Sequence, residues 1–160
     1  METKIPPPIV TLIFIFLIGF SNRLIEPFNF EYQMPFGIII IIFGLSVLIS
    51  AVRVFKQLET TINPMQPSQA SRLATIGPFK YTRNPMYLGM SIMLLGFGLI
   101  FGAKLTLCLV ILFILYITFF QIIPEERAMK EKFNDWEDYC SKVRRLSLIH
   151  ISEPTRQASI

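Results

Sequence analysis

Four long apolar runs constrain what this chain can fold into more than any other feature of its sequence. They cover residues 5–20, 36–52, 86–103 and 105–123. A helix needs about 20 apolar residues, with a range of about 17–25, to cross the hydrocarbon core of a bilayer. The second and fourth runs meet this length, the third meets it with its flanks, and the first is short. The pattern predicts an all-α integral membrane bundle of about four transmembrane helices.

The composition excludes other classes of protein. Hydrophobic residues make up 52% of the chain and charged residues 16%, against roughly 25% charged in soluble proteins. The apolar content is too high for an intrinsically disordered chain, and two cysteines are too few for a disulfide scaffold. The first run lacks the small-residue cleavage pattern of a signal peptide, so we interpret it as a short or tilted helix.

The basic residues predict the orientation in the membrane. If the N-terminus is cytoplasmic, only Arg23 and Lys104 of the 15 lysines and arginines fall on the far side. This bias follows the positive-inside rule for an even number of spans. We therefore expect both termini in the cytoplasm and interpret the net charge of +4 as a sign of orientation, not of nucleic-acid binding. The small size favours a bacterial inner membrane over the endoplasmic reticulum.

The loops and the C-terminal segment complete the expected fold. The third and fourth runs are joined so closely that they must form a tight hairpin, in which Gly98 and Gly102 either allow close approach or are simply glycines common in membrane helices. Residues 125–145 predict one amphipathic cytoplasmic helix, on the membrane surface or folded back on the bundle. Its apolar stripe recurs at steps of three and four residues: Met129, Phe133, Trp136, Cys140 and Val143.

Residues 147–160 read unlike the rest of the chain. They resemble the translated read-through of a sequencing adaptor, so we expect this tail to be non-native. The only histidine, His150, lies in it and is expected to carry no chemistry. A Ser-His-Asp triad is then excluded, and no Cys/His cluster is present for a metal. The chain also lacks a Gly-rich dinucleotide motif and a P-loop.

Two polar groups of residues remain, both at the cytoplasmic border. Asn84 is a good N-cap and Pro85 suits the first helical position, so the third helix is expected to start there and to attract anions beside Arg83. The alternative is a capped membrane helix with a positive-inside arginine, and Tyr81 and Tyr87 can likewise be ordinary interfacial aromatics.

The second group is Glu125 and Glu126, directly after the fourth apolar run. Acidic residues suit the first turn of a helix, but a carboxylate buried there without a cation would cost several kcal/mol. We expect Arg83, Arg127 or a cationic ligand as its partner. Because the third and fourth helices form a hairpin, both groups face the same side, and together they suit a zwitterionic ligand.

Three stretches of sequence carry a resemblance to a known family. They read Gly-Pro-Phe-Lys-Tyr-Thr-Arg-Asn-Pro-Met-Tyr-Leu-Gly, then about 35 residues later Pro-Glu-Glu-Arg, and then Phe-Asn-Asp-Trp-Glu-Asp-Tyr-Cys-Ser-Lys-Val-Arg-Arg. Over roughly residues 70–145 the chain resembles the isoprenylcysteine carboxyl methyltransferase family and its phospholipid methyltransferase relatives. The resemblance implies that residues 1–146 form a single membrane methyltransferase-like domain.

The resemblance also implies a cofactor and a class of substrate. The family uses S-adenosylmethionine, bound in a cytoplasmic pocket, and acts on a lipidic or prenylated acceptor. It names no catalytic residue here and no metal. By the family pattern the cofactor site is lined by Tyr81, Arg83, Asn84, Pro85, Tyr87, Gly89, Glu125 and Glu126. The family usually has histidine where this chain has Asn84.

The acceptor and two alternative functions stay open at this point. A carboxylate acceptor needs no base, whereas an amine must arrive neutral. With no histidine to deprotonate an amine, the sequence favours a carboxylate or a thiol-like acceptor, and first of all a carboxylate of the isoprenylcysteine type. One alternative is an NADPH-dependent membrane reductase of the sterol type, whose C-terminal half can look similar. The other is a non-catalytic membrane protein of the same fold.

Overall fold

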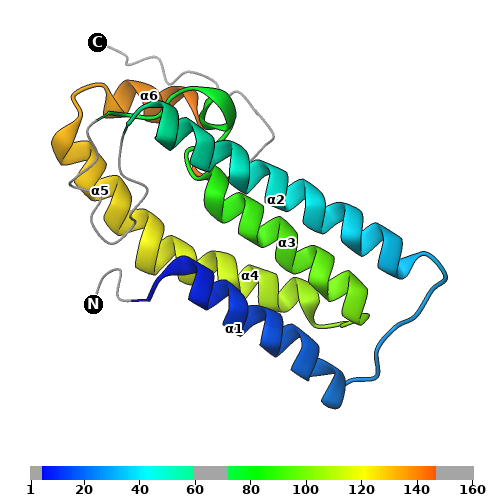
Figure 1. The fold of residues 1–160 in the computed structure, drawn as a ribbon. Coiled ribbons are helices and arrows are strands. Elements are labelled where there is room, and N and C mark those ends of the chain that lie inside the picture. The colour runs from blue at the N-terminus through cyan, green and yellow to red at the C-terminus, as the bar shows by residue number, and fades with distance from the viewer. Residues whose placement is uncertain (1–4, 60–71, 147–160) are drawn as a thin grey trace, which may run out of the picture.

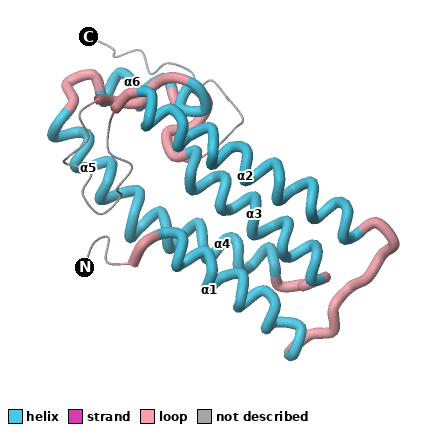
Figure 2. The backbone as a smooth tube through the Cα atoms, viewed as in Figure 1, coloured by secondary structure: helices cyan, strands magenta, loops and turns pink. Residues whose placement is uncertain are grey.

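All regular elements in the part of the chain that the structure describes are helices. The structure is a computed structural model and describes residues 5–59 and 72–146 (Figures 1 and 2). The expected non-native tail lies outside these residues. The helices are α1 (Pro7–Phe20), α2 (Gln33–Gln57), α3 (Pro85–Phe101), α4 (Thr106–Ile117), α5 (Ile123–Lys132) and α6 (Trp136–Lys142).

The first four helices run up and down beside one another, and α3 contacts the other three (Figure 1). The apolar core lies between α1, α3 and α4, where Ile18, Leu94 and Phe113 are completely buried. The tight hairpin between α3 and α4 is confirmed. This alternation brings the starts of α1 and α3 and the ends of α2 and α4 to one end of the bundle, where α5 and α6 also lie (Figure 1).

The contact between α2 and α3 depends on two pairs of glycines. A Cβ on Gly44 would lie 2.7 Å from the carbonyl oxygen of Gly89, and a Cβ on Gly89 would lie 2.7 Å from that of Gly44. Gly37 and Gly96 form an equivalent pair, with the corresponding distances at 2.9 and 2.8 Å. Each helix repeats its glycine after seven residues, two turns along the same face. Small residues of this kind let membrane helices approach backbone to backbone.

The two glycines that the sequence singled out have different roles. Gly98 lies against Thr106 at the start of α4, and a Cβ there would overlap that side chain, so close approach in the hairpin is confirmed at this position. Gly102 ends α3 in the left-handed conformation, with φ at 66°. Its carbonyl oxygen accepts a hydrogen bond from Phe28 N at 2.9 Å, which ties the α1–α2 connection to the far end of the hairpin.

The outward faces of the helices are apolar. Large hydrophobic side chains are exposed along the whole outer side of α2: Met34, Phe36, Ile38, Ile39, Ile42, Phe43, Leu45 and Ile49. Such a continuous apolar surface is unfavourable in water and suits lipid. Two helices are long and apolar enough to cross a membrane, Gln33–Gln57 and Thr106–Lys132. Since α1 and α3 have 14 and 17 residues, the count of four spans stays a prediction.

The longer of these two helices contains a wide turn. A π-helical turn, Thr118–Ile122, joins α4 to α5 and directly precedes the turn that holds Pro124. A proline inside a helix cannot donate its backbone bond and its ring clashes with the preceding turn. Widening that turn lets the helix continue, and such π turns are frequent at functional sites. Glu125 and Glu126 lie just after it, in the first turn of α5.

The prediction of one amphipathic helix over residues 125–145 is wrong in its extent. The chain leaves the helix at Phe133, whose backbone is extended, and resumes it as α6. Asn134 and Asp135 favour a turn at this point because their side chains compete with helical hydrogen bonding. The apolar stripe nevertheless gathers in one cluster around Trp136, with Leu73 packed against it. Residues 133–146, here called the C-terminal strap, therefore fold back on the bundle, one of the two placements expected.

Replacing Gly44 by alanine should separate α2 from α3. The added methyl group meets backbone, so overpacking should lower the free energy of unfolding by about 1–3 kcal/mol. Gly19→Ala is the matched control, because a Cβ there makes an ordinary contact of 3.5 Å with Phe101 and alanine is the better helix former. Thermal unfolding in detergent compares the two. Equal stability of both variants would contradict the glycine-pair account.

Candidate functional site

The start of α3 lies where the sequence placed it, but its cap is different. Pro85 occupies the first turn and Asn84 the N-cap position, yet the Asn84 side chain makes no capping bond. Its amide nitrogen instead donates to the carbonyl oxygen of Arg145 in the strap, at 3.0 Å. Thr82 donates to the same carbonyl at 3.1 Å. The predicted capping role of the Asn84 side chain is therefore wrong, because the strap takes the amide group.

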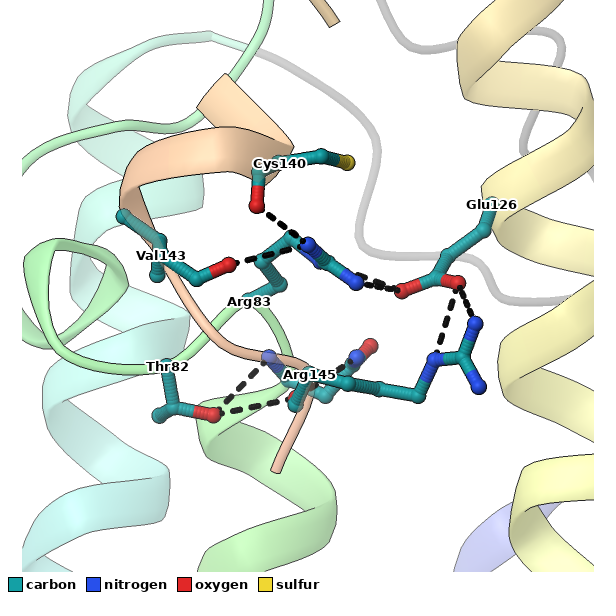
Figure 3. Close-up of polar contacts among 7 residues, drawn as sticks. Thr82, Arg83, Glu126, Cys140, Val143 and Arg145 are labelled. Atoms are coloured by element: carbon teal, nitrogen blue, oxygen red, sulfur yellow. Dashed lines mark hydrogen bonds and ion pairs between the residues drawn. The ribbon is translucent and has the colours of Figure 1, made fainter. Parts of the chain in front are cut away.

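Arg83 is the central side chain of this end of the bundle (Figure 3). Its Nε and Nη2 atoms lie 3.1 and 3.0 Å from Oε1 of Glu126. Its Nη1 atom donates to the carbonyl oxygens of Cys140 and Val143, at 3.1 and 2.9 Å. The guanidinium also lies 6.0 Å from the centre of the Trp136 ring. Only 11% of the side chain is exposed, so Arg83 joins α3, α5 and the strap from within.

Glu126 is held between two guanidinium groups. Its Oε1 atom faces Arg83, while Oε2 accepts from Nε and Nη2 of Arg145 at 3.0 and 2.6 Å (Figure 3). The side chain is 13% exposed, so its charge needs these partners. The expected partner Arg83 is confirmed. Arg145 was not among the expected partners, although it ends the last stretch that carries the family resemblance.

Glu125 faces another neighbour. The hydroxyl of Tyr87, a buried residue in the first turns of α3, donates to Oε1 of Glu125. The two adjacent glutamates are thus divided: Glu126 meets the cations, and Glu125 meets a phenol between α3 and α5. The start of α3, the start of α5 and the strap together contribute to one polar cluster. This cluster, here called the charged cluster, consists of Arg83, Tyr87, Glu125, Glu126 and Arg145.

Tyr139 anchors the strap and was not singled out from the sequence. Its hydroxyl donates to the carbonyl oxygen of Phe79 at 2.7 Å. Burial raises the pKa of this hydroxyl above its ordinary value, and the nearby Arg83 charge opposes the shift more weakly. The group therefore stays protonated and remains a donor. A tyrosine one turn after the only tryptophan looked like an ordinary interfacial aromatic.

The remaining predicted site residues lie around the charged cluster in different ways. Pro85 is buried, and Gly89 lies against Gly44 on α2, so both shape α3. Tyr81 is 64% exposed. A cofactor-binding role for any of the eight predicted residues stays a prediction. Within residues 5–59 and 72–146 no three His, Cys, Asp or Glu side chains gather to hold a metal ion.

Fold and site together define a helical membrane protein with a partly buried charged cluster at one end. Residues 32–135 match the family model described as phospholipid methyltransferase. Because this match covers more than half of the chain, the protein belongs to the phospholipid methyltransferase family. No curated protein and no solved structure matches it.

The family match confirms one part of the resemblance and indicates a membrane methyltransferase. The isoprenylcysteine branch of the resemblance stays a prediction. The matched residues run from just before α2 to just before α6, so they include Arg83, Glu125 and Glu126. Helix α1 and most of the strap lie outside them.

Removing the Arg83 charge should loosen this end of the bundle. Arg83→Gln leaves Glu126 with one partner and breaks two bonds to the strap, so we expect a loss of about 3–5 kcal/mol in unfolding free energy. Lys130→Gln is the control, because its pair with Glu137 is exposed and contributes little. Fluorescence of Trp136, the only tryptophan, reports the strap during denaturation in detergent. Similar losses in both variants would argue against the buried pair as the main restraint.

Proposed function

We propose that this protein is an S-adenosylmethionine-dependent methyltransferase that acts on a lipid-like acceptor at the cytoplasmic face of a membrane. One observation carries the proposal: within the family-matched part of the chain, a cation and two carboxylates come together beside the apolar surface. A water-soluble cofactor and a lipid acceptor can meet only at such a border. The distribution of basic residues in the sequence supports a cytoplasmic placement of this end.

The charges of the cluster fit those of the proposed cofactor. Its methionine part carries a carboxylate, which suits Arg83, and an ammonium group, which suits Glu125 or Glu126. In the structure Arg83 and Glu126 bind each other. Binding a zwitterion therefore exchanges partners, and each buried protein charge keeps an opposite charge beside it. A pair of charges at 4 Å is worth about 4 kcal/mol at an effective dielectric near 20, so such an exchange can be nearly balanced.

When bound, the cofactor supplies an already activated methyl group, so the protein mainly has to orient the acceptor. We propose a carboxylate acceptor of the isoprenylcysteine type, because a carboxylate needs no base and the described residues contain no histidine. Glu125 favours a second candidate, a lipid amine. In this proposal its carboxylate takes the proton that an amine must lose.

A substitution at Glu126 tests the cofactor site. Glu126→Gln should weaken binding of S-adenosylhomocysteine at least about tenfold, because one charged partner is lost. Glu137→Gln, which alters an exposed carboxylate, is the control. Isothermal titration in detergent gives both affinities. Unchanged affinity would remove Glu126 from the cofactor site. A wild-type chain that binds NADPH alone would favour the reductase, and one that binds neither compound a non-catalytic protein.

The acceptor can be assigned by a second substitution. If the acceptor is a carboxylate, Glu125→Gln should change kcat for a prenylcysteine by less than about threefold once cofactor is saturating. If it is an amine, the same substitution should lower kcat for phosphatidylethanolamine by about 100-fold, the usual contribution of a positioned base. Radiolabelled methyl transfer to the two acceptors measures this. Transfer to neither acceptor by the wild-type chain would contradict both assignments.

A further inference from the structure

In the π-helical turn, only one of the two polar atoms of the Gln121 side chain has a hydrogen-bond partner among the described residues. Gln121 is 1% exposed, and its Nε2 atom donates to the carbonyl oxygen of Ile5 at 2.8 Å. A carbonyl can only accept, so the nitrogen must face it and the identity of the other amide atom follows. That atom, Oε1, is buried and has no hydrogen-bond partner among the described residues.

Gln121 lies next to the charged cluster along the helix. It precedes Glu125 by four residues, a spacing that places two residues on neighbouring positions of one helical face. Glu125 in turn accepts a bond from Tyr87 on α3. Ser91, four residues after Tyr87, is buried and donates to the backbone carbonyl of Tyr87. Polar groups thus continue one turn inward from the cluster on both helices.

The tether to Ile5 does not explain why this residue is an amide. The tether uses the nitrogen alone, and within residues 5–59 and 72–146 the buried oxygen has no donor. A buried acceptor without a donor is destabilising, most of all inside a membrane. The four-residue spacing therefore puts two side chains with acceptor oxygens, Gln121 and Glu125, one helical turn apart. A ligand group that carries hydrogen-bond donors is the chemistry that satisfies them.

We propose that Oε1 of Gln121 accepts a hydrogen bond from an N–H group of the ligand that binds at Glu125. Gln121 is then a ligand-binding residue one turn deeper in the bundle than the charged cluster. The inference rests on the proposed function, since it concerns the same site. The N–H group has two possible sources, an amino group of the cofactor or an amino group or amide of the lipid acceptor, and the experiment below separates them.

Three variants isolate the amide oxygen. Gln121→Met keeps the length of the side chain and removes both the oxygen and the tether. Gln121→Glu keeps an acceptor oxygen. Asn22→Leu is the matched control, because Asn22 also donates to a backbone carbonyl, that of Phe101 at 2.8 Å, and its buried oxygen likewise has no partner in the described part of the chain. Asn22 follows α1 and lies at the far end of the bundle.

Each variant is purified in detergent and measured in two ways: titration with S-adenosylhomocysteine, and KM for the lipid acceptor at saturating cofactor. If the cofactor supplies the N–H group, Gln121→Met weakens S-adenosylhomocysteine binding about fivefold to tenfold, the effect of one neutral hydrogen bond. If the acceptor supplies it, that affinity is unchanged and KM rises by a similar factor. In both cases Gln121→Glu stays within about threefold of wild type for the affected quantity, and Asn22→Leu matches wild type.

Two results overturn the inference while leaving the proposed function intact. One is a Gln121→Met variant that matches wild type in both measurements. The other is a Gln121→Glu variant that loses as much as Gln121→Met, since the tether and not the oxygen would then be responsible. If Gln121→Met does not fold, a loss of about fivefold to tenfold in Gln121→Glu overturns the inference by itself. A wild-type chain that neither binds S-adenosylhomocysteine nor transfers methyl groups overturns the proposed function, and the inference with it.

Discussion

The ion pair between Arg83 and Glu126 is the interaction on which this end of the molecule depends. Both side chains are nearly buried, and two charges removed from water are stable only when each retains well-placed partners. Glu126 is satisfied by Arg83 and Arg145, and the remaining donors of Arg83 are satisfied by backbone carbonyls of the strap. The strap must therefore lie across the starts of α3 and α5, although its own apolar cluster is small.

The rest of the bundle positions these charges. The glycine pairs hold α3 against α2 at backbone contact, which fixes the position of the start of α3 and of Arg83 just before it. The two glutamates follow the π-helical turn, and because adjacent residues of a helix point about 100° apart they meet different neighbours, Glu126 the guanidinium groups and Glu125 the hydroxyl of Tyr87. A single stretch of two adjacent acids thereby provides one carboxylate within a charge network and one beside the apolar core. This division suits a ligand with a charged and a less polar part.

Much of the fold could be predicted from the sequence because hydrophobic length is a strong, local signal. The helices in the four apolar runs and the hairpin at Gly102 followed from it, and the hairpin in turn predicted the meeting of Arg83 with Glu126. The glycine pairs could not be predicted, since Gly44 meets Gly89 only when the register between two separate helices is known. The break in the C-terminal helix could not be predicted either, because the periodic apolar stripe continues through Phe133 although the helical backbone ends before it.

In the candidate site, the hydrogen-bond and ion-pair partners of several side chains could not be predicted from the sequence. Asn84 has the residue type and position of an N-cap, and its amide goes instead to a strap carbonyl 61 residues away. Arg145 is present in the sequence, but its pairing with Glu126 could not be predicted because it depends on the strap folding back. Gln121 looked like one polar residue in an apolar run. The partners of all three side chains lie far away in the sequence, and local sequence patterns carry no information about such contacts.

Photolabelling shows directly where the proposed cofactor binds. Ultraviolet irradiation of the purified protein with radiolabelled S-adenosylmethionine, followed by peptide mapping, identifies the residues that lie against it. We expect the label within residues 83–89 or 125–145, where the charged cluster lies, and we expect excess S-adenosylhomocysteine to prevent the labelling. Protectable label confined to residues 20–36, at the opposite end of the bundle, would contradict this expectation.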